Sequence, residues 1–321
     1  MKIVFMGTPE FAVPVLQGLI DFYDVIGVVS QPDKRVGRKQ ILEETPIKKL
    51  ANQYQIPVLQ PIKIRTDYQA VLDLHPDVIV TCAYGQIIPK EILDFPKFGC
   101  INVHASLLPK LRGGAPIRRA IMEGYSKTGI TIMYMDEKMD NGDIISQRET
   151  DILDSDNLES LQNRLSLMGK ELLLETLPSV FSQTNKRVKQ DENEITFAYN
   201  VKREEEQIDF SKTAREIFNL IRGLSPSPSA NTILFGEEMK VLESKIFDRK
   251  YEKAVCGEIV DITKEGIVVS CSDGSILLTK IKPFGKKEMS AASYVNGVGK
   301  EKLIGRVFEN AEISRDNSEN S

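Results

Sequence analysis

Two polar side chains that lie two residues apart are the first candidates for chemistry in this sequence. Asn102 and His104 fall in an apolar stretch that is typical of a strand, so both side chains are expected on one face of a sheet. The asparagine amide is a neutral donor, and the imidazole can carry a proton near neutral pH. Together they could stabilise negative charge that develops on an oxygen atom.

The chain after His104 turns sharply and is shaped for close packing. The turn comprises Ser106, Leu107, Leu108 and Pro109, and a helix is predicted from Ala115 to Gly124. In open α/β sheets, ligands bind at such strand ends. An isolated Asn-x-His pair is usually structural, because polar residues near turns satisfy backbone groups. This apolar loop, in a chain with 2 histidines, favours a functional site.

A carboxylate completes the candidate set. Asp140 lies in an acidic loop, residues 136–143, and together with Asn102 and His104 it falls at the predicted strand ends of one sheet. It could orient and charge the imidazole, or take a proton from an attacking amine. The sequence has no Gly-x-Ser-x-Gly elbow and no metal-ligand spacing around its histidines. The set therefore suits acyl transfer to an amine.

The elements that position these residues predict an α/β fold. Buried strands at Lys2–Met6 and Asp24–Val29 flank a helix and form a βαβ opening, which usually indicates a parallel sheet. We expect a Rossmann-like, mostly parallel sheet in a catalytic domain of residues 1–189. Nicotinamide binding is not expected, because one glycine stands where three are needed and Ser30 and Gln31 supply no acid at the tip of the second strand.

The second half of the chain differs in character. Residues 190–206 are polar and mixed in charge, which predicts a linker. Residues 207–311 begin with a helix and continue as short strands, at a spacing typical of a small OB-like β-barrel. Residues 312–321 are polar and are expected to be a disordered tail.

Composition sets outer bounds on the class of protein. The chain has 321 residues, 41% of them hydrophobic and 27% charged, with a net charge of −4, as a soluble protein of two domains would have. No apolar run could span a membrane and the N-terminus lacks a signal-peptide core, so we expect a cytoplasmic protein. No cysteines have zinc or redox spacing. Apolar surroundings predict buried thiols at Cys82, Cys100 and Cys271.

Two basic clusters raise the question of a polyanionic partner. The first lies in a predicted polar loop and comprises Lys34, Arg35, Arg38 and Lys39; the second comprises Lys280, Lys282, Lys286 and Lys287. Charge runs are more often solvated surface, but contact with nucleic-acid phosphates is the alternative. The residues alone leave both readings open.

Several segments with distinctive motifs are spread along almost the whole chain. They are Gly7-Thr-Pro-Glu-Phe-Ala, Gln31-Pro-Asp, Ala83-Tyr-Gly-Gln-Ile-Ile-Pro, Gly99-Cys-Ile-Asn-Val-His-Ala-Ser-Leu-Leu-Pro, Arg112-Gly-Gly-Ala-Pro-Ile, Thr128-Gly-Ile-Thr-Ile-Met, Ile221-Arg-Gly-Leu-Ser-Pro and Gly285-Lys-Lys-Glu-Met. Together these segments resemble the methionyl-tRNA formyltransferase family. The Asn-x-His and Ser-Leu-Leu-Pro elements are common to folate-dependent formyltransferases of this fold. The first segment and the C-terminal segments indicate the substrate.

This resemblance implies a reaction and roles for the residues. The formyl group of 10-formyltetrahydrofolate would pass to the α-amine of methionyl initiator tRNA, supporting translation initiation, without a metal and in a monomer. Asn102 and His104 would stabilise the tetrahedral oxyanion, and Asp140 would pair with His104 and assist proton transfer. The folate pocket would be lined by Ser106, Leu107, Leu108 and Pro109. Contacts with tRNA are expected from Lys34, Arg35, Arg38, Lys39, Lys286 and Lys287.

The chain departs from the family pattern in two places. Residues 138–143 read Lys-Met-Asp-Asn-Gly-Asp where the family often has Gly-Leu-Asp-Thr-Gly-Asp, and Phe210 stands where tryptophan is common. The first departure keeps Asp140 and the Gly-Asp pair that follows, so the catalytic acid is expected to be retained.

Three alternatives remain. Glycinamide ribonucleotide formyltransferase would share the chemistry but would not need a second domain. A formyltransferase for an amino nucleotide-sugar would have a different second domain. An RNA-binding protein that has lost catalysis would not need Asn102, His104 and Asp140 together.

Overall fold

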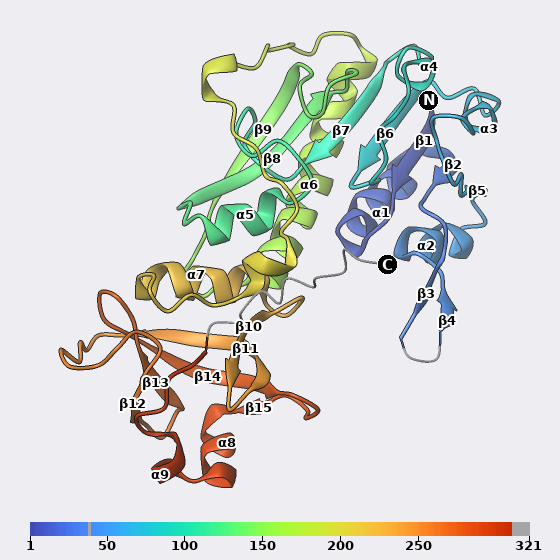
Figure 1. Ribbon diagram of the computed structural model, residues 1–321. Helices are drawn as coiled ribbons and strands as arrows, with labels where there is room; N and C mark the ends of the chain where they lie inside the picture. The colour runs from blue at the N-terminus through green and yellow to red at the C-terminus, as the bar shows by residue number, and fades with distance from the viewer. Residues whose placement is uncertain (38–39, 310–321) are drawn as a thin grey trace, which may run out of the picture. The chain divides into compact units, whose positions relative to one another are not determined.

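The computed structural model describes residues 1–37 and 40–309 and divides into two compact units (Figure 1). The first unit comprises Met1–Ile117, Ser126–Leu153 and Ser160–Asn200, and the second comprises Arg118–Tyr125, Asp154–Glu159 and the described residues from Val201 onward. The chain thus passes into the second unit inside the predicted linker, and two short segments from the first half cluster with that unit. The predicted tail and the basic residues Arg38 and Lys39 lie outside the described residues.

A seven-stranded sheet in the order β5-β2-β1-β6-β7-β8-β9 forms the centre of the first unit. Its strands are β1 (Lys2–Gly7), β2 (Asp24–Val29), β5 (Val58–Leu59), β6 (Val78–Cys82), β7 (Cys100–His104), β8 (Lys127–Tyr134) and β9 (Ile144–Asp151). Pairing is parallel from β5 to β7 and antiparallel from β7 through β9. The predicted Rossmann-like, mostly parallel sheet is confirmed.

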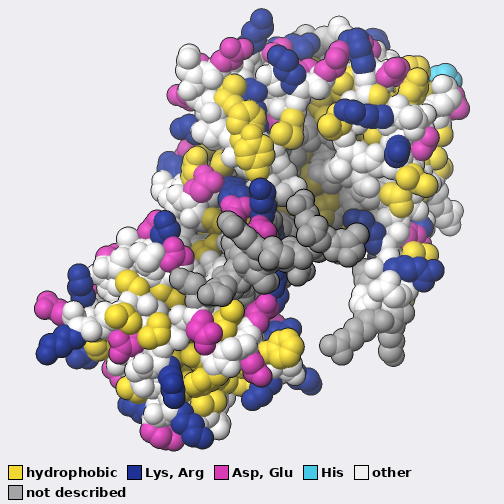
Figure 2. All heavy atoms as spheres, viewed as in Figure 1, with side chains coloured by type: hydrophobic (Ala, Val, Ile, Leu, Met, Phe, Trp, Pro, Cys, Tyr) yellow, Lys and Arg dark blue, Asp and Glu magenta, His cyan; other side chains and the backbone are white. Residues whose placement is uncertain are grey.

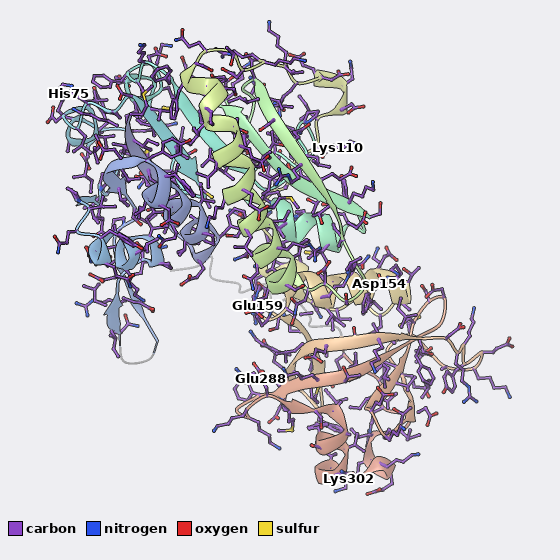
Figure 3. The ribbon with its side chains drawn as sticks, turned by 180° about the vertical axis from the view of Figure 1, so that it is seen from behind. His75, Lys110, Asp154, Glu159, Glu288 and Lys302 are labelled. Atoms are coloured by element: carbon purple, nitrogen blue, oxygen red, sulfur yellow. The ribbon has the colours of Figure 1, made fainter. Side chains whose placement is uncertain are left out.

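Helices cover this sheet, and α6 fixes the orientation of β7. The helices of the first unit are α1 (Val13–Phe22), α2 (Pro46–Gln53), α3 (Gln69–Leu72), α4 (Lys90–Leu93) and most of α6 (Leu158–Phe181), whereas α5 (Pro116–Met122) passes into the second unit after Ile117. Figure 3 shows α6 lying across the sheet on one face. A Cβ atom at Gly169 would lie 3.0 Å from Val103 Cγ1, so α6 packs tightly on that side chain. Because side chains alternate along β7, Asn102 and His104 point to the opposite face.

The second unit is an antiparallel sheet with helices, which confirms the predicted class of the second domain. Its strands are β10 (Ala230–Leu234), β11 (Glu237–Phe247), β12 (Ile259–Ile262), β13 (Ile267–Ser270), β14 (Ser275–Pro283) and β15 (Met289–Ser290). They pair in the order β10-β11-β14-β13-β12, with β15 on β14. Helix α7 (Ala214–Leu224) begins with a capping box between Thr213 and Glu216 and buries Ile217 and Ile221 in the core.

Some local elements differ from the sequence prediction. The basic segment predicted as a loop contains an antiparallel hairpin of β3 (Lys34–Val36) and β4 (Ile41–Glu43), with Gly37 at a φ of +68° in its turn. Each of these strands has only three residues, which is too short for a recognisable alternation of apolar and polar side chains, so the hairpin was not predicted. Helices α8 (Ala291–Val298) and α9 (Lys300–Leu303) were likewise not expected.

The cysteine prediction is confirmed, since Cys82, Cys100 and Cys271 are buried, whereas Cys256 is exposed. Burial raises the pKa of each of the three buried thiols. Within the described residues, no helix combines the length and apolar character needed to cross a membrane.

Candidate active site

Strand β7 presents Asn102 and His104 on one face, and a neighbouring strand fixes the amide. Thr81 on β6 donates a hydrogen bond from its Oγ1 to Asn102 Oδ1 over 2.8 Å. The two strands pair in parallel and bring Thr81 directly beside Asn102. With its oxygen engaged by Thr81, Asn102 keeps its amide N–H groups available as donors.

The two ring nitrogens of His104 face different partners. The residue is 6% exposed, with Nε2 lying 3.1 Å from the carbonyl oxygen of Leu111 and Nδ1 lying 3.6 Å from Asp140 Oδ1. A carbonyl oxygen can only accept, so Nε2 must carry the hydrogen in the first contact. A second ring proton, on Nδ1, would then point at the carboxylate.

Asp140 reaches His104 from the loop between β8 and β9. Its backbone has a φ of +51°, in the left-handed region that non-glycine residues rarely adopt. The other carboxylate oxygen, Oδ2, accepts a hydrogen bond of 2.8 Å from the backbone N–H of Gly113. Gly113 has a φ of +123°, and a Cβ there would lie 2.8 Å from Ala198 O, so only glycine fits.

The loop predicted to bind folate is braced by the antiparallel strands. Thr131 on β8 donates to Ser106 O over 2.7 Å and accepts from the backbone N–H of Leu108 at 3.1 Å. The Ser106 hydroxyl is turned inward and donates to Lys110 O over 2.6 Å. Leu108 is buried, whereas Leu107 and Pro109 are half-buried. The surface that this loop offers is therefore mainly apolar.

Four residues predicted to contact tRNA are described by the structure, and all four are exposed. Lys34 and Arg35 lie on β3, and Lys286 and Lys287 lie in the turn after β14, where the N–H of Lys286 bonds Pro283 O over 3.0 Å. None of the four forms an ion pair within residues 1–37 and 40–309. Figure 2 shows basic and acidic side chains interspersed on the visible face. Any attraction of a polyanion would therefore be local.

Three residues that contact the candidate set, or the loop that carries Asp140, were not assigned a role from the sequence. Thr81 holds Asn102, and Arg112 and Gln190 contact the loop of Asp140. Arg112 is 5% exposed, and burial lowers the pKa of its guanidinium, opposed by the nearby carboxylate of Asp140. Arg112 was visible as part of a motif, but Gln190 stood in a polar stretch with no periodic pattern to mark it.

Two family models place the chain among the formyltransferases. A family model described as "Formyl transferase" matches residues 1–177, and a model described as "Formyl transferase, C-terminal domain" matches residues 200–299. A methionyl-tRNA formyltransferase of Bacillus cereus is 52% identical over 315 residues, covering 97% of this chain and 100% of the relative. One from Bacillus cytotoxicus is 53% identical over 301 residues, covering 92% and 96%. The chain belongs to the methionyl-tRNA formyltransferase family.

Solved structures with low sequence identity share the fold. An N-formyltransferase of Helicobacter canadensis, in complex with folinic acid and dTDP-3-aminofucose, superposes with a TM-score of 0.67 at 19% identity, covering 88% of this chain and all of the other. HypX of Aquifex aeolicus, in complex with tetrahydrofolic acid, gives 0.63 at 16% identity over 92% of this chain and 47% of HypX.

Proposed function

We propose that Asn102, His104 and Asp140 carry out formyl transfer from 10-formyltetrahydrofolate to the α-amine of methionine on initiator tRNA. The observation that supports this assignment most directly is the distance of 3.6 Å between His104 Nδ1 and Asp140 Oδ1. Family membership at 52% identity identifies the chain as a folate-dependent formyltransferase. We further propose that it acts as a monomer in the cytoplasm.

The reaction needs an attack, a stabilised intermediate and two proton movements. The amine nitrogen of methionine forms a bond to the formyl carbon, and the electron pair of the C=O bond moves to oxygen. The Asn102 amide and the His104 imidazole donate hydrogen bonds to this oxyanion. When the intermediate collapses, the bond from carbon to N10 of the folate breaks. The amine loses one proton and N10 gains one, with Asp140 and His104 assisting.

The resting contact of His104 must change during this reaction. Its Nε2–H is donated to the neutral Leu111 carbonyl at 3.1 Å, while Nδ1 faces Asp140. An oxyanion is a stronger acceptor than a neutral carbonyl, so we expect it to take over this hydrogen. Asp140 is placed to compensate any positive charge that develops on the ring during proton transfer.

The apolar loop fits the expected folate co-substrate. Leu107 and Pro109 remain half-exposed, and a Cβ at Gly129 would lie 2.6 Å from Leu107 Cδ2, so the backbone of β8 packs directly under the loop. We infer that Ser106 to Pro109 form a wall against the co-substrate. The inward-facing Ser106 hydroxyl serves the loop itself.

A direct assay tests the function. Purified protein is given 10-formyltetrahydrofolate with methionyl initiator tRNA, glycinamide ribonucleotide or a dTDP-linked amino sugar in turn. The expected result is formylmethionyl-tRNA and no product from the other two amines. Preferential formylation of either small amine would overturn the tRNA assignment while leaving the catalytic set in place.

A further inference from the structure

The side-chain amide of Gln190 uses all of its hydrogen-bonding capacity on the catalytic loop. Its Nε2 donates to Asp140 O over 2.8 Å and to Gly142 O over 2.9 Å. Its Oε1 accepts from Arg112 Nε at 3.0 Å and from Arg112 Nη2 at 2.7 Å. Backbone carbonyls can only accept and a guanidinium can only donate, so these partners allow one orientation of the amide.

The backbone around Gln190 is tied to the first unit on both sides. Val188 exchanges two hydrogen bonds with Ile144 at the start of β9, of 2.8 and 2.9 Å. Further along, the Ala198 N–H donates to Arg112 O over 2.7 Å, and the Arg112 N–H donates to Thr196 O over 2.9 Å. These flanking hydrogen bonds fix the backbone of Gln190 relative to the turn at residues 140–142, as a positioning residue requires.

The turn that Gln190 holds is one that needs support. Asp140 has a φ of +51°, a conformation that costs of order 1 kcal/mol or more for a residue with a side chain. At Gly142 a Cβ would lie 1.9 Å from Tyr134 O, so the turn also packs directly on the end of β8. The two N–H groups of Gln190 bond the carbonyls on either side of Asn141, and so fix the backbone direction from which the Asp140 side chain departs.

Gln190 also determines where the Arg112 guanidinium donates. A buried guanidinium near a carboxylate commonly forms a bidentate pair through two of its N–H groups. Here the Nε and Nη2 edge of Arg112 is taken by Gln190 Oε1, and Nη1 donates to Asn141 Oδ1 over 3.0 Å. The carboxylate of Asp140 is left for Gly113 and His104.

We propose that Gln190 is a positioning residue for formyl transfer, which keeps the Asp140 carboxylate directed at His104 and out of a pair with Arg112. The proposal rests on the function assigned to Asp140 above. It places a residue from the polar stretch after α6 among those that determine the turnover number, without contact with either substrate.

Two substitutions and a neighbouring control test the role. Gln190→Ala removes all four hydrogen bonds, and Gln190→Glu keeps the volume and the Arg112 contact but loses both donors to the turn. Lys189→Ala alters an exposed neighbour and serves as the control. We expect kcat to fall about 10- to 100-fold in both Gln190 variants, as is usual for a misplaced catalytic group. The KM for folate and for tRNA should stay within about twofold of wild type, and Lys189→Ala should be unchanged.

A double-mutant cycle separates positioning from general destabilisation. If Gln190 acts through Asp140, Gln190→Ala should cost little further activity in an Asp140→Asn background. A full, independent loss in that background would overturn the proposal, as would unchanged kcat in both Gln190 variants. Thermal unfolding and circular dichroism establish that each compared variant is folded. If Gln190→Ala is not folded, Gln190→Glu replaces it in the cycle.

The outcomes also separate this inference from the proposed function. If the proposed function fails, the wild-type protein makes no formylmethionyl-tRNA. If only this inference fails, the wild-type protein is active, and the Gln190 variants either share that activity or lose it independently of Asp140.

Discussion

The proposed active site combines two regions whose side chains are positioned in different ways. The side-chain directions of Asn102 and His104 are set by one regular strand, β7, with α6 packed on its other face. Asp140 stands on an irregular turn at positive φ, and its position depends on Gly113 and on Gln190, which is 50 residues further along the chain. Regular backbone pairing fixes the conformation of the strand, whereas the conformation of this turn depends on hydrogen bonds with residues that are distant in the sequence. The strand pair should therefore tolerate changes around it better than the turn does.

The largest expected effect comes from the strand region itself. Asn102→Ala or His104→Ala removes a donor to the oxyanion and should lower kcat by about 100- to 1,000-fold, with the fold retained. Steady-state kinetics with circular dichroism would measure this. Turnover near the wild-type rate in either variant would show that the strand pair is not the oxyanion site.

Asp140→Asn tests the turn region with little change in shape. It removes the charge that faces His104, and we expect kcat to fall about 100-fold, at the lower end for a proton-transfer group. Binding of folate, measured by titration, should be nearly unchanged. The control is Asp143→Asn, because Asp143 lies in the same loop and pairs with the exposed Arg187 at 3.0 Å. Loss of activity in the control alone would make Asp143 the catalytic acid.

The same contrast separates what the sequence predicted from what it did not. Alternation along an apolar strand predicted that Asn102 and His104 share a face, and the structure places them so. The conformation of the loop at Asp140 could not be derived, because it depends on hydrogen bonds from Gln190 and Arg112 that no local pattern encodes. The β3–β4 hairpin was missed for a similar reason, since strands this short give no usable periodicity.

Thr81→Val tests whether β7 alone is enough to position the Asn102 amide. It removes the hydroxyl that bonds Asn102 Oδ1, while the strand backbone is kept. We expect kcat to fall about 3- to 10-fold, the equivalent of one neutral hydrogen bond. Thr128→Val is a matched control, because the buried Thr128 hydroxyl has no hydrogen-bond partner in the described part of the chain. Equal losses in the two variants would mean that Asn102 needs no support from Thr81.

The smallest effect on turnover is expected from the exposed basic residues Lys34, Arg35, Lys286 and Lys287, which lie outside the proposed catalytic set. Lys34→Ala with Arg35→Ala, and Lys286→Ala with Lys287→Ala, should each raise the KM for charged tRNA several-fold. The slope of log KM against the logarithm of the salt concentration should decrease by about one for each lost phosphate contact, because each contact releases a counterion. The KM for folate should not change, since the apolar loop lies at the end of β7.

The control for these charge removals is a lysine whose charge is already compensated. Lys49 lies close to the hairpin in sequence and pairs with Glu43 over 3.1 Å, so Lys49→Ala should leave the salt dependence unchanged. The net charge of −4 is no obstacle to tRNA binding, because fields are screened within about 10 Å at ordinary salt and local charge decides. If one pair of substitutions changes the KM for tRNA and the other does not, tRNA is held by that unit alone. If neither changes it, both clusters are solvated surface and the polyanion must be bound elsewhere.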